Sequence, residues 1–251
     1  MIASIETGIL SSPPVALLEG ATLFIDFDGT LVEIVDSPDA VHVDDPLRDL
    51  LAALHAALEG RVAIVSGRSL AQLDAMLGPL ARTLALSGSH GNEHRWNGVT
   101  AHPVRPVTLD AATNAFRDFA ATYPGALVET KSYSVALHYR QALSIEARAQ
   151  SIAARLADEL DLGLEQGKMV VELRVAGGDK GIAAHRFMAR APMAGTRPLF
   201  IGDDLTDEAG FEAVRALGGV GILVGESRLT AAEFALPDVA AVRNWLARAT
   251  R

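Results

Sequence analysis

Cysteine is absent from this 251-residue sequence, so the chain can form neither disulfides nor thiolate metal sites. Lysine is scarce: the basic residues are almost all arginine, and only Lys131, Lys168 and Lys180 are lysines. Acidic residues outnumber basic ones, and the net charge of −9 disfavours binding to nucleic acid or to an anionic membrane. No apolar run approaches the roughly 18 residues of a membrane span. We therefore expect no nucleic-acid partner and no membrane association.

The first 20 residues have no basic stretch ahead of their apolar residues, which is not the pattern of a secretory signal peptide. Together with the missing cysteine, this predicts a cytoplasmic protein, and we expect a monomer. With 49% hydrophobic and 21% charged residues, the chain can bury a substantial core. It can do so as one large domain or as a core domain with an insertion.

Short apolar runs alternate with segments of helical period, the pattern of a mostly parallel sheet covered by helices. The predicted buried strands are residues 22–26, 61–66, 83–88 and 198–203, and the predicted helices are 44–58, 70–77, 180–190 and 207–217. In open α/β sheets, ligands collect at the carboxyl ends of the strands, where these runs end in small or polar residues. The sequence therefore predicts an α/β fold with a ligand site at that edge of the sheet.

The pattern changes near Pro106, where two successive units each predict a helix followed by two half-exposed strands. The helices are expected at residues 109–123 and 145–160, and the strands at 126–131, 133–140, 163–167 and 168–174. Prolines before this region and the pair Gly177-Gly178 after it supply breaks. We expect residues 106–177 to form an inserted α+β module and residues 1–105 and 178–251 to form the main domain.

Carboxylates follow two of the predicted strands. Asp26 and Asp28, in FIDFDGT, are two residues apart on an extended segment, so they could face one small volume, where they repel unless a proton or a metal compensates them. A second cluster follows in IGDDLTDE, with Asp203, Asp204 and Asp207. Oxygen donors without histidine or cysteine suit Mg²⁺. The alternatives are an ordinary Asp-Gly turn and an acidic helix start.

A phosphate ester beside these carboxylates would need hydrogen-bond donors and positive charge. Ser66 ends a predicted strand and precedes Gly67 and Arg68 at a helix start, where backbone N–H groups favour anions. Lys180 lies at another predicted helix N-terminus, which is unfavourable for a cation unless an anion faces it. A solvated lysine is the alternative, but a lysine in a chain that otherwise uses arginine suggests a point-charge role.

In this order, DFDGT, VSGR, GGDKG and GDDLTDE resemble the four motifs of the haloacid dehalogenase-like phosphohydrolases. The segments SHGNE, VETKSYSVALHYR and KMVVELR are similar to those of the trehalose-6-phosphate phosphatase family, although Asn92 and Val175 depart from its common pattern. The resemblance spans residues 22 to about 224. It implies a Rossmann-like core with an inserted cap, and Mg²⁺-dependent hydrolysis of trehalose 6-phosphate as the final step of trehalose biosynthesis.

The resemblance also implies roles for the core residues. Asp26 would attack phosphorus and form an aspartyl-phosphate, and Asp28 would act as general acid and then as general base. Ser66 and Lys180 would bind the phosphoryl group. The residues implied for the metal site are Asp26, the backbone carbonyl of Asp28 and Asp203, with Asp204 and Asp207 as supporting residues.

In the implied cap, the resemblance assigns contacts with the distal glucose to Glu129, Lys131 and Glu172. Glu129 and Lys131 are two residues apart on one predicted strand and so share a face. A family segment at the boundary of core and cap is matched by Arg68, His90, Gly91 and Glu93, and the resemblance implies that these four residues bind substrate. For Glu93 and His138, the alternative to a role in substrate binding is ordinary hydrogen bonding at the surface. For Arg140, the alternative is an ion pair across the cap sheet.

Other functions stay open at this point. A related phosphatase could act on sucrose phosphate, mannosyl-phosphoglycerate or a hexose phosphate with the same core. Only the residues Glu129, Lys131 and Glu172 argue against these other substrates. A catalytically silent domain that binds a sugar phosphate for regulation is the alternative from another class. That alternative predicts damage to one of the four motifs, and the sequence contains none.

Overall fold

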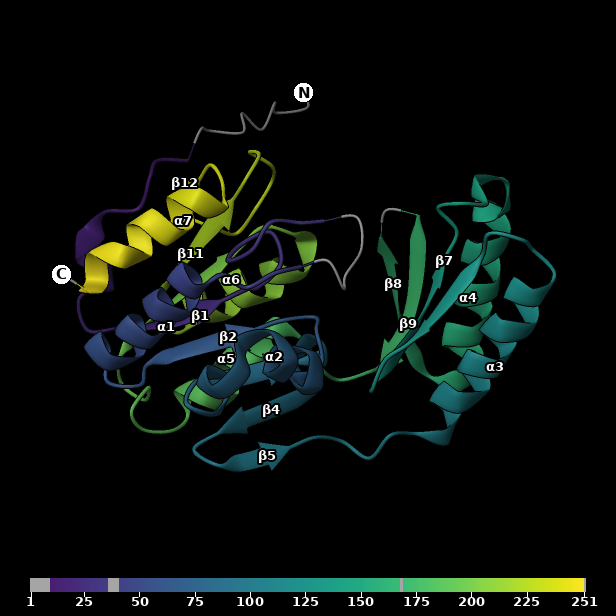
Figure 1. The fold of residues 1–251 in the computed structure, drawn as a ribbon, viewed down its shortest axis with the longest axis horizontal. Helices are drawn as coiled ribbons and strands as arrows, with labels where there is room; N and C mark the ends of the chain where they lie inside the picture. Colours follow the sequence, from purple (N-terminus) through teal and green to yellow (C-terminus); the bar gives the residue numbers. More distant parts are fainter. Residues whose placement is uncertain (1–9, 36–40, 168, 251) are drawn as a thin grey trace, which may run out of the picture. The chain divides into compact units, whose positions relative to one another are not determined.

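The computed structural model describes residues 10–35, 41–167 and 169–250. The chain divides into two compact units (Figure 1). The first unit runs to Ala101 and resumes at Asp179, and the second comprises His102–Gly178. Each predicted helix and strand has a counterpart whose ends lie within two residues of the predicted ones, but Lys168, where one predicted strand begins, lies outside the described residues. Four strands, Glu93–Trp96, Val99–Ala101, Val220–Val224 and Phe234–Leu236, and the helix Val239–Leu246 were not predicted.

The first unit is built on an eight-stranded sheet with the strand order β12-β11-β10-β1-β2-β3-β4-β5. All neighbours from β12 to β3 pair in parallel, whereas β4 and β5 are antiparallel. The α/β fold with a mostly parallel sheet is thereby confirmed. The strands are β1 Ala21–Ile25, β2 Val62–Val65, β3 Ala85–Gly88, β4 Glu93–Trp96, β5 Val99–Ala101, β10 Arg197–Gly202, β11 Val220–Val224 and β12 Phe234–Leu236.

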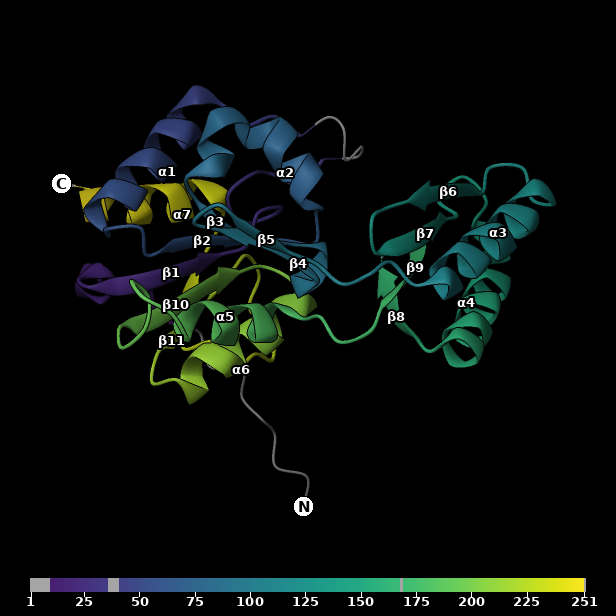
Figure 2. The ribbon, with the colours of Figure 1, turned by 90° about the horizontal axis from the view of Figure 1, so that it is seen from below.

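Helices cover both faces of this sheet (Figure 2). One face carries α1 Asp45–Ala57, α2 Leu70–Leu77 and α7 Val239–Leu246, and the other carries α5 Lys180–Met188 and α6 Glu208–Ala216. The short 3-10 helices of this unit are η1 Val15–Leu18, η3 Gly78–Arg82, η4 Ser89–Gly91, η6 Leu205–Asp207 and η7 Ala247–Thr250. The result is a layer of strands between two layers of helices.

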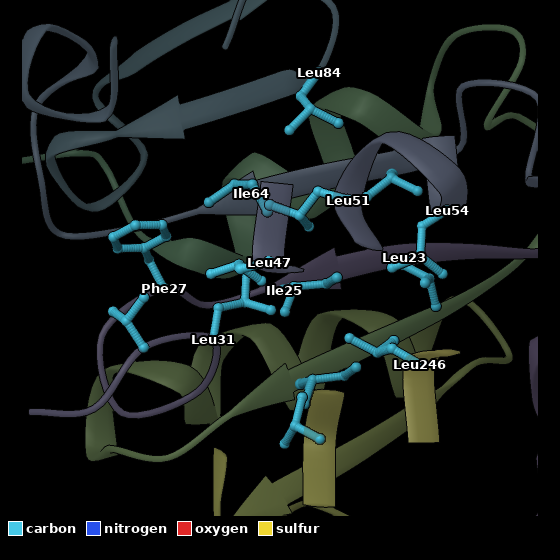
Figure 3. Packing of buried hydrophobic residues seen from close by; sticks show 14 of the residues in the cluster. Leu23, Ile25, Phe27, Leu31, Leu47, Leu51, Leu54, Ile64, Leu84 and Leu246 are labelled. Atoms are coloured by element: carbon cyan, nitrogen blue, oxygen red, sulfur yellow. The ribbon is translucent and has the colours of Figure 1, made fainter. Parts of the chain in front are cut away.

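Strand β1 is buried along its whole length, as expected for a central parallel strand that is covered on both faces. Its residues Leu23 and Ile25 belong to one core cluster together with Leu51 of α1 (Figure 3). Phe24 points to the opposite cluster, where its ring stacks at 6.3 Å from Phe187 of α5. Packing on both sides therefore fixes the strand that ends at Asp26.

The second unit is a four-stranded antiparallel sheet with two α-helices on one face (Figure 2). Its elements are α3 Val107–Ala121, β6 Leu127–Thr130, β7 Ser134–His138, η5 Leu143–Ile145, α4 Glu146–Leu160, β8 Leu162–Gly167 and β9 Val170–Val175, and its strand order is β6-β7-β9-β8. Apolar side chains face the helices. The strand register aligns Glu129, Ala136, Glu172 and Glu165 across the sheet, so the face away from the helices is polar.

None of the helices in the described part of the chain is both long enough and apolar enough to cross a bilayer.

We expect Leu51→Ala to lower the free energy of unfolding by about 2–5 kcal/mol, because it leaves a cavity between α1 and the sheet. The Leu51 side chain is 0% exposed. Urea unfolding followed by circular dichroism measures the change. The matched control is Leu229→Ala, at a position that is 73% exposed, where a change below about 0.5 kcal/mol is expected. Equal losses in the two variants would contradict this account of the core.

Candidate active site

The polar residues after β1, β2 and β10 lie at one edge of the main sheet, because these three parallel strands are neighbours in the order β10-β1-β2. Asp26 directly follows β1, Ser66 follows β2 and Asp203 follows β10. Asp26 and Ser66 are 4% and 1% exposed. The sheet topology thus brings together residues from three distant parts of the chain.

Lys180, the first residue of α5, is the centre of the site. Its Nζ donates to Oδ1 of Asp26 at 2.7 Å and to Oδ1 of Asp207 at 2.6 Å, and lies 3.9 Å from Oδ1 of Asp204. The side chain is buried. Burial lowers its pKa, but the carboxylates of Asp26 and Asp207 outweigh burial and raise the pKa above its ordinary value. The ammonium therefore stays charged.

Three carboxyl groups of the site, those of Asp26, Asp203 and Asp207, have pKa values above the ordinary range. Burial raises the pKa of Asp26 to about 7 against the opposing effect of Lys180. Burial, and then the neighbouring charges of Asp204 and Asp207, raise the pKa of Asp203 to about 6. One ammonium does not balance so many carboxylates, so the site favours a further positive charge, whether a proton or a metal ion.

Carboxylate oxygens of Asp26, Asp203 and Asp207 lie within 4.8 Å of one another. Both oxygens of Asp207 already accept hydrogen bonds, one from Lys180 at 2.6 Å and one from the backbone N–H of Asp204 at 3.0 Å. Asp26 and Asp203 are therefore the better pair for a cation. Oxygen-only donors of this kind fit Mg²⁺.

The Gly-Thr pair after Asp28 shapes the place of Asp203. A Cβ at Gly29 would lie 2.2 Å from Oδ2 of Asp203, and the φ of Gly29 is +79°, so a side chain at this position is excluded both by space and by conformation. Thr30 donates from its hydroxyl to Oδ1 of Asp203 at 3.3 Å. The DGT sequence thus positions a carboxylate that comes from 173 residues further along the chain.

Asp28 has a different partner from Asp26. Arg68 donates from Nε to Oδ2 and from Nη2 to Oδ1 of Asp28, both at 2.7 Å, which is a bidentate ion pair. The guanidinium also lies over the ring of Phe27, 6.0 Å from its centroid. The two aspartates of the DFDGT motif are therefore held by cations from two separate segments, Arg68 after β2 and Lys180 on α5.

The segment that follows β3 lies directly against the loop after β2. His90 and Gly91 belong to the short helix η4, and the ring of His90 lies so close to Gly67 that a Cβ there would come within 2.6 Å of it. Glu93 is 9% exposed, and its carboxylate accepts from Ser89 Oγ at 2.6 Å and from the backbone N–H of Leu70 at 3.2 Å. These contacts direct the Glu93 carboxylate into the protein.

Asp204 is the N-cap of the short helix η6. Its carboxylate accepts hydrogen bonds from the backbone N–H of Thr206 at 2.8 Å and from its hydroxyl at 2.7 Å. It is a capping residue at the rim of the acidic cluster, with a side chain that is 54% exposed.

In the second unit, Glu129, Lys131 and Glu172 lie on the polar face of the sheet. Lys131 Nζ is 2.8 Å from Oε2 of Glu172. Burial lowers the pKa of Lys131, but Glu172 together with Glu129 and Glu165 raises it above its ordinary value. His138 Nε2 is 3.0 Å from Oε2 of Glu129. A further ion pair on this face joins Arg174 to Glu165 at 3.4 Å. The sequence analysis did not predict it, although the alternation of side chains along the two strands places both residues on this face.

The protein-family model for trehalose-phosphatase matches residues 24–240 of the chain. The chain belongs to the trehalose-phosphatase family. The family is an enzyme family, and its members are phosphatases. The resemblance seen in the motifs is thereby confirmed.

Two curated relatives illustrate the similarity. The chain is 41% identical over 227 residues to a trehalose-6-phosphate phosphatase of Escherichia coli (strain K12), covering 89% of this chain and 84% of the relative. It is 36% identical over 239 residues to a probable trehalose-phosphate phosphatase of Sinorhizobium fredii, with 88% of each chain covered.

Solved structures agree with the fold. A crystal structure of a trehalose-6-phosphate phosphatase related protein superposes with a TM-score of 0.76 at 28% identity, covering 90% of this chain and 95% of the other. The C-terminal domain of the C. albicans trehalose-6-phosphate phosphatase superposes with a TM-score of 0.82 at 22% identity, covering 96% and 98%. The second likeness shows the fold alone.

We expect Asp203→Asn to stabilise the metal-free protein at pH 8 and to lose that effect as the pH falls from about 6 towards 4. The folded-state pKa of Asp203 is about 6 against an ordinary 3.8, so the folded state binds the proton more tightly than the unfolded state does. The ionised carboxylate therefore destabilises the fold above pH 6, and this penalty disappears on protonation.

Thermal unfolding in the presence of a chelator, at pH 8 and at pH 4.5, measures this difference. Asp118→Asn, at an exposed position of α3, is the matched control. The prediction is wrong if the variant unfolds at a lower temperature than the wild type at pH 8. It is also wrong if the variant gains the same amount in thermal midpoint at both pH values, because the charge of Asp203 would then not destabilise the fold.

Proposed function

We propose that this phosphatase hydrolyses trehalose 6-phosphate to trehalose and inorganic phosphate. The observation that carries the proposal is the buried contact of Lys180 with Asp26 at the carboxyl edge of the sheet, beside Ser66 and Asp203. A nucleophilic carboxylate, a fixed ammonium and a hydroxyl are the groups that phosphoryl transfer through a covalent intermediate needs. Family membership supports trehalose 6-phosphate as the substrate.

In the proposed reaction, a carboxylate oxygen of Asp26 attacks phosphorus, and the bond from phosphorus to the sugar oxygen breaks. Asp28 gives its proton to the departing sugar oxygen and then takes a proton from the water that hydrolyses the aspartyl-phosphate. Lys180 and Ser66 hold the phosphoryl oxygens and stabilise their charge. Because Asp28 is paired with Arg68 in the structure, its carboxylate has to separate from this arginine before it can serve as an acid.

Mg²⁺ is the proposed cofactor, held by Asp26, the backbone carbonyl of Asp28 and Asp203, with Asp204 and Asp207 in support. Bound there, it would offset the negative charges of nucleophile and phosphate. The raised pKa values of Asp26 and Asp203 support this assignment, because a carboxylate whose negative charge is disfavoured by burial and by neighbouring carboxylates is stabilised by a divalent cation. Asp207 contributes mainly by keeping Lys180 in place.

We further propose that residues 106–177 act as a sugar-recognition cap on a core formed by residues 1–105 and 178–251. Glu129, Lys131 and Glu172 share one polar sheet face, which offers both donors and acceptors to sugar hydroxyls. Arg68, His90 and Gly91 are proposed to line the phosphate side of the substrate. The cytoplasmic location, the monomeric state and the lack of nucleic-acid or membrane partners remain predictions from the sequence.

A silent regulatory domain is the competing proposal. The C-terminal domain of a Candida albicans trehalose synthase regulatory protein superposes with a TM-score of 0.66 at 15% identity, so the fold by itself does not decide activity. The intact Asp26–Lys180–Asp207 contact favours catalysis. Phosphatases for sucrose phosphate or hexose phosphates would share this core and differ in the second unit.

We expect Asp26→Asn to reduce phosphate release from trehalose 6-phosphate by at least about 10³-fold, because it removes the nucleophile. The assay compares trehalose 6-phosphate, sucrose 6-phosphate and glucose 6-phosphate with and without Mg²⁺, and circular dichroism confirms that the variant is folded. Asp45→Asn, on the exposed end of α1, is the control. Retained turnover in the variant would refute the mechanism, and a preference for another sugar would refute only the substrate.

We expect Lys131→Ala to raise KM for trehalose 6-phosphate about tenfold or more while leaving hydrolysis of a small aryl phosphate nearly unchanged, because the lysine lies in the second unit and would contact only the sugar. Steady-state kinetics on both substrates measure the split. Arg155→Ala, on the exposed face of α4, is the matched control. If both substrates lose activity equally, Lys131 does not recognise the sugar.

A further inference from the structure

The turn between β3 and β4 has an unusual backbone. Ser89, His90 and Gly91 have φ values of 49°, 53° and 90°, so three consecutive residues, two of them with side chains, are in the left-handed region. Residues other than glycine adopt this conformation at a cost and keep it only where their surroundings impose it. Contacts with neighbouring segments must therefore hold this turn in its conformation.

The turn is fastened on one side to the loop that carries Ser66 and Arg68. The backbone N–H of Ser89 donates to the carbonyl of Arg68 at 2.8 Å, and the N–H of His90 donates to the carbonyl of Ser66 at 3.1 Å. Gly88, just before the turn, passes so close that a Cβ there would lie 2.7 Å from the Arg68 carbonyl oxygen. The positions of Ser66 and Arg68 therefore depend on the turn.

On its other side the turn touches the residue before Lys180. A Cβ at Gly91 would lie 2.3 Å from the carbonyl oxygen of Asp179. Asp179 caps α5 by accepting from the backbone N–H of Ile182 at 2.6 Å. The turn thus lies between the two segments that are proposed to hold the phosphoryl group, the loop with Ser66 and the start of α5.

One buried carboxylate locks this arrangement. Oε2 of Glu93 accepts from the Ser89 hydroxyl at 2.6 Å and from the backbone N–H of Leu70, the first residue of α2, at 3.2 Å. A carboxylate at a helix N-terminus satisfies a free N–H group and interacts favourably with the helix dipole. Glu93 therefore ties the turn to the helix that follows Arg68.

We propose that Glu93, acting through the Ser89 hydroxyl, is a positioning residue for the phosphoryl site and does not bind the sugar. It holds the left-handed turn that sets Ser66 and Arg68 against the start of α5. This inference rests on the proposed function, since it concerns the same site. It replaces the expectation that the Glu93 carboxylate contacts substrate.

The test compares Glu93→Gln, Glu93→Ala and Ser89→Ala with the wild type on two substrates, trehalose 6-phosphate and a small aryl phosphate, and measures inhibition by inorganic phosphate. We expect kcat/KM to fall by the same factor on both substrates, about tenfold for Glu93→Gln and Ser89→Ala and more for Glu93→Ala, because a displaced catalytic group loses rate steeply. The inhibition constant for phosphate should rise in the same order. Ser87→Ala is the matched control, because its hydroxyl bonds the Glu93 carbonyl at 3.3 Å without joining the turn to the loop.

Losses confined to trehalose 6-phosphate would overturn the proposal and make Glu93 a sugar ligand. A lower thermal midpoint with unchanged kinetics and phosphate inhibition would overturn it as well, leaving a purely structural carboxylate. If Glu93→Ala does not fold, Glu93→Gln and Ser89→Ala decide. If the wild type ignores trehalose 6-phosphate, the proposed substrate fails, while the aryl phosphate and inhibition measurements still test Glu93.

Discussion

The ammonium of Lys180 is the contact on which the site depends. It is buried between Asp26 at the end of β1 and Asp207 at the start of α6, so it connects the central strand with the N-termini of two helices. A buried charge is tolerated only when it is paired and fully hydrogen-bonded. The close packing of α5 on α6 keeps it so: a Cβ at Gly181 would lie 2.4 Å from the carbonyl oxygen of Ala209. The helices and the charge network therefore stabilise each other.

Much of this arrangement follows from the sequence because it is local. Continuous apolar runs predict buried parallel strands, and the residues after them must lie at the sheet edge, so Asp26, Ser66 and Asp203 could be brought together without coordinates. The glycine after Asp28 was expected only to form a turn, and the threonine that follows it was given no role. Their actual function, making room for Asp203 and bonding it, depends on a residue far away in the chain.

The structure could not be predicted from the sequence where elements are short or where contacting residues are far apart along the chain. The hairpin β4–β5 has a half-exposed first strand and a fully exposed second one, so it lacks the alternation that identifies strands. Arg68 and Asp28 are separated by 40 residues, and no local pattern pairs them. The sequence suggested substrate binding or ordinary surface hydrogen bonding for Glu93, and no local pattern showed that the backbone N–H of Leu70, 23 residues earlier, donates to its carboxylate.

The polar face of the second unit has a consequence for selectivity. Its polar and charged side chains are already paired with each other, Lys131 with Glu172, His138 with Glu129 and Arg174 with Glu165. These side chains are therefore ordered before any ligand arrives, and a ligand would not have to bear the entropy of immobilising them. A neutral ligand that is rich in hydroxyl groups can bind to these paired side chains by exchanging hydrogen bonds, whereas a strongly charged ligand would have to break ion pairs. On the proposed function, a cap that presents this face would therefore distinguish ligands by the pattern of their hydroxyl groups more than by their net charge.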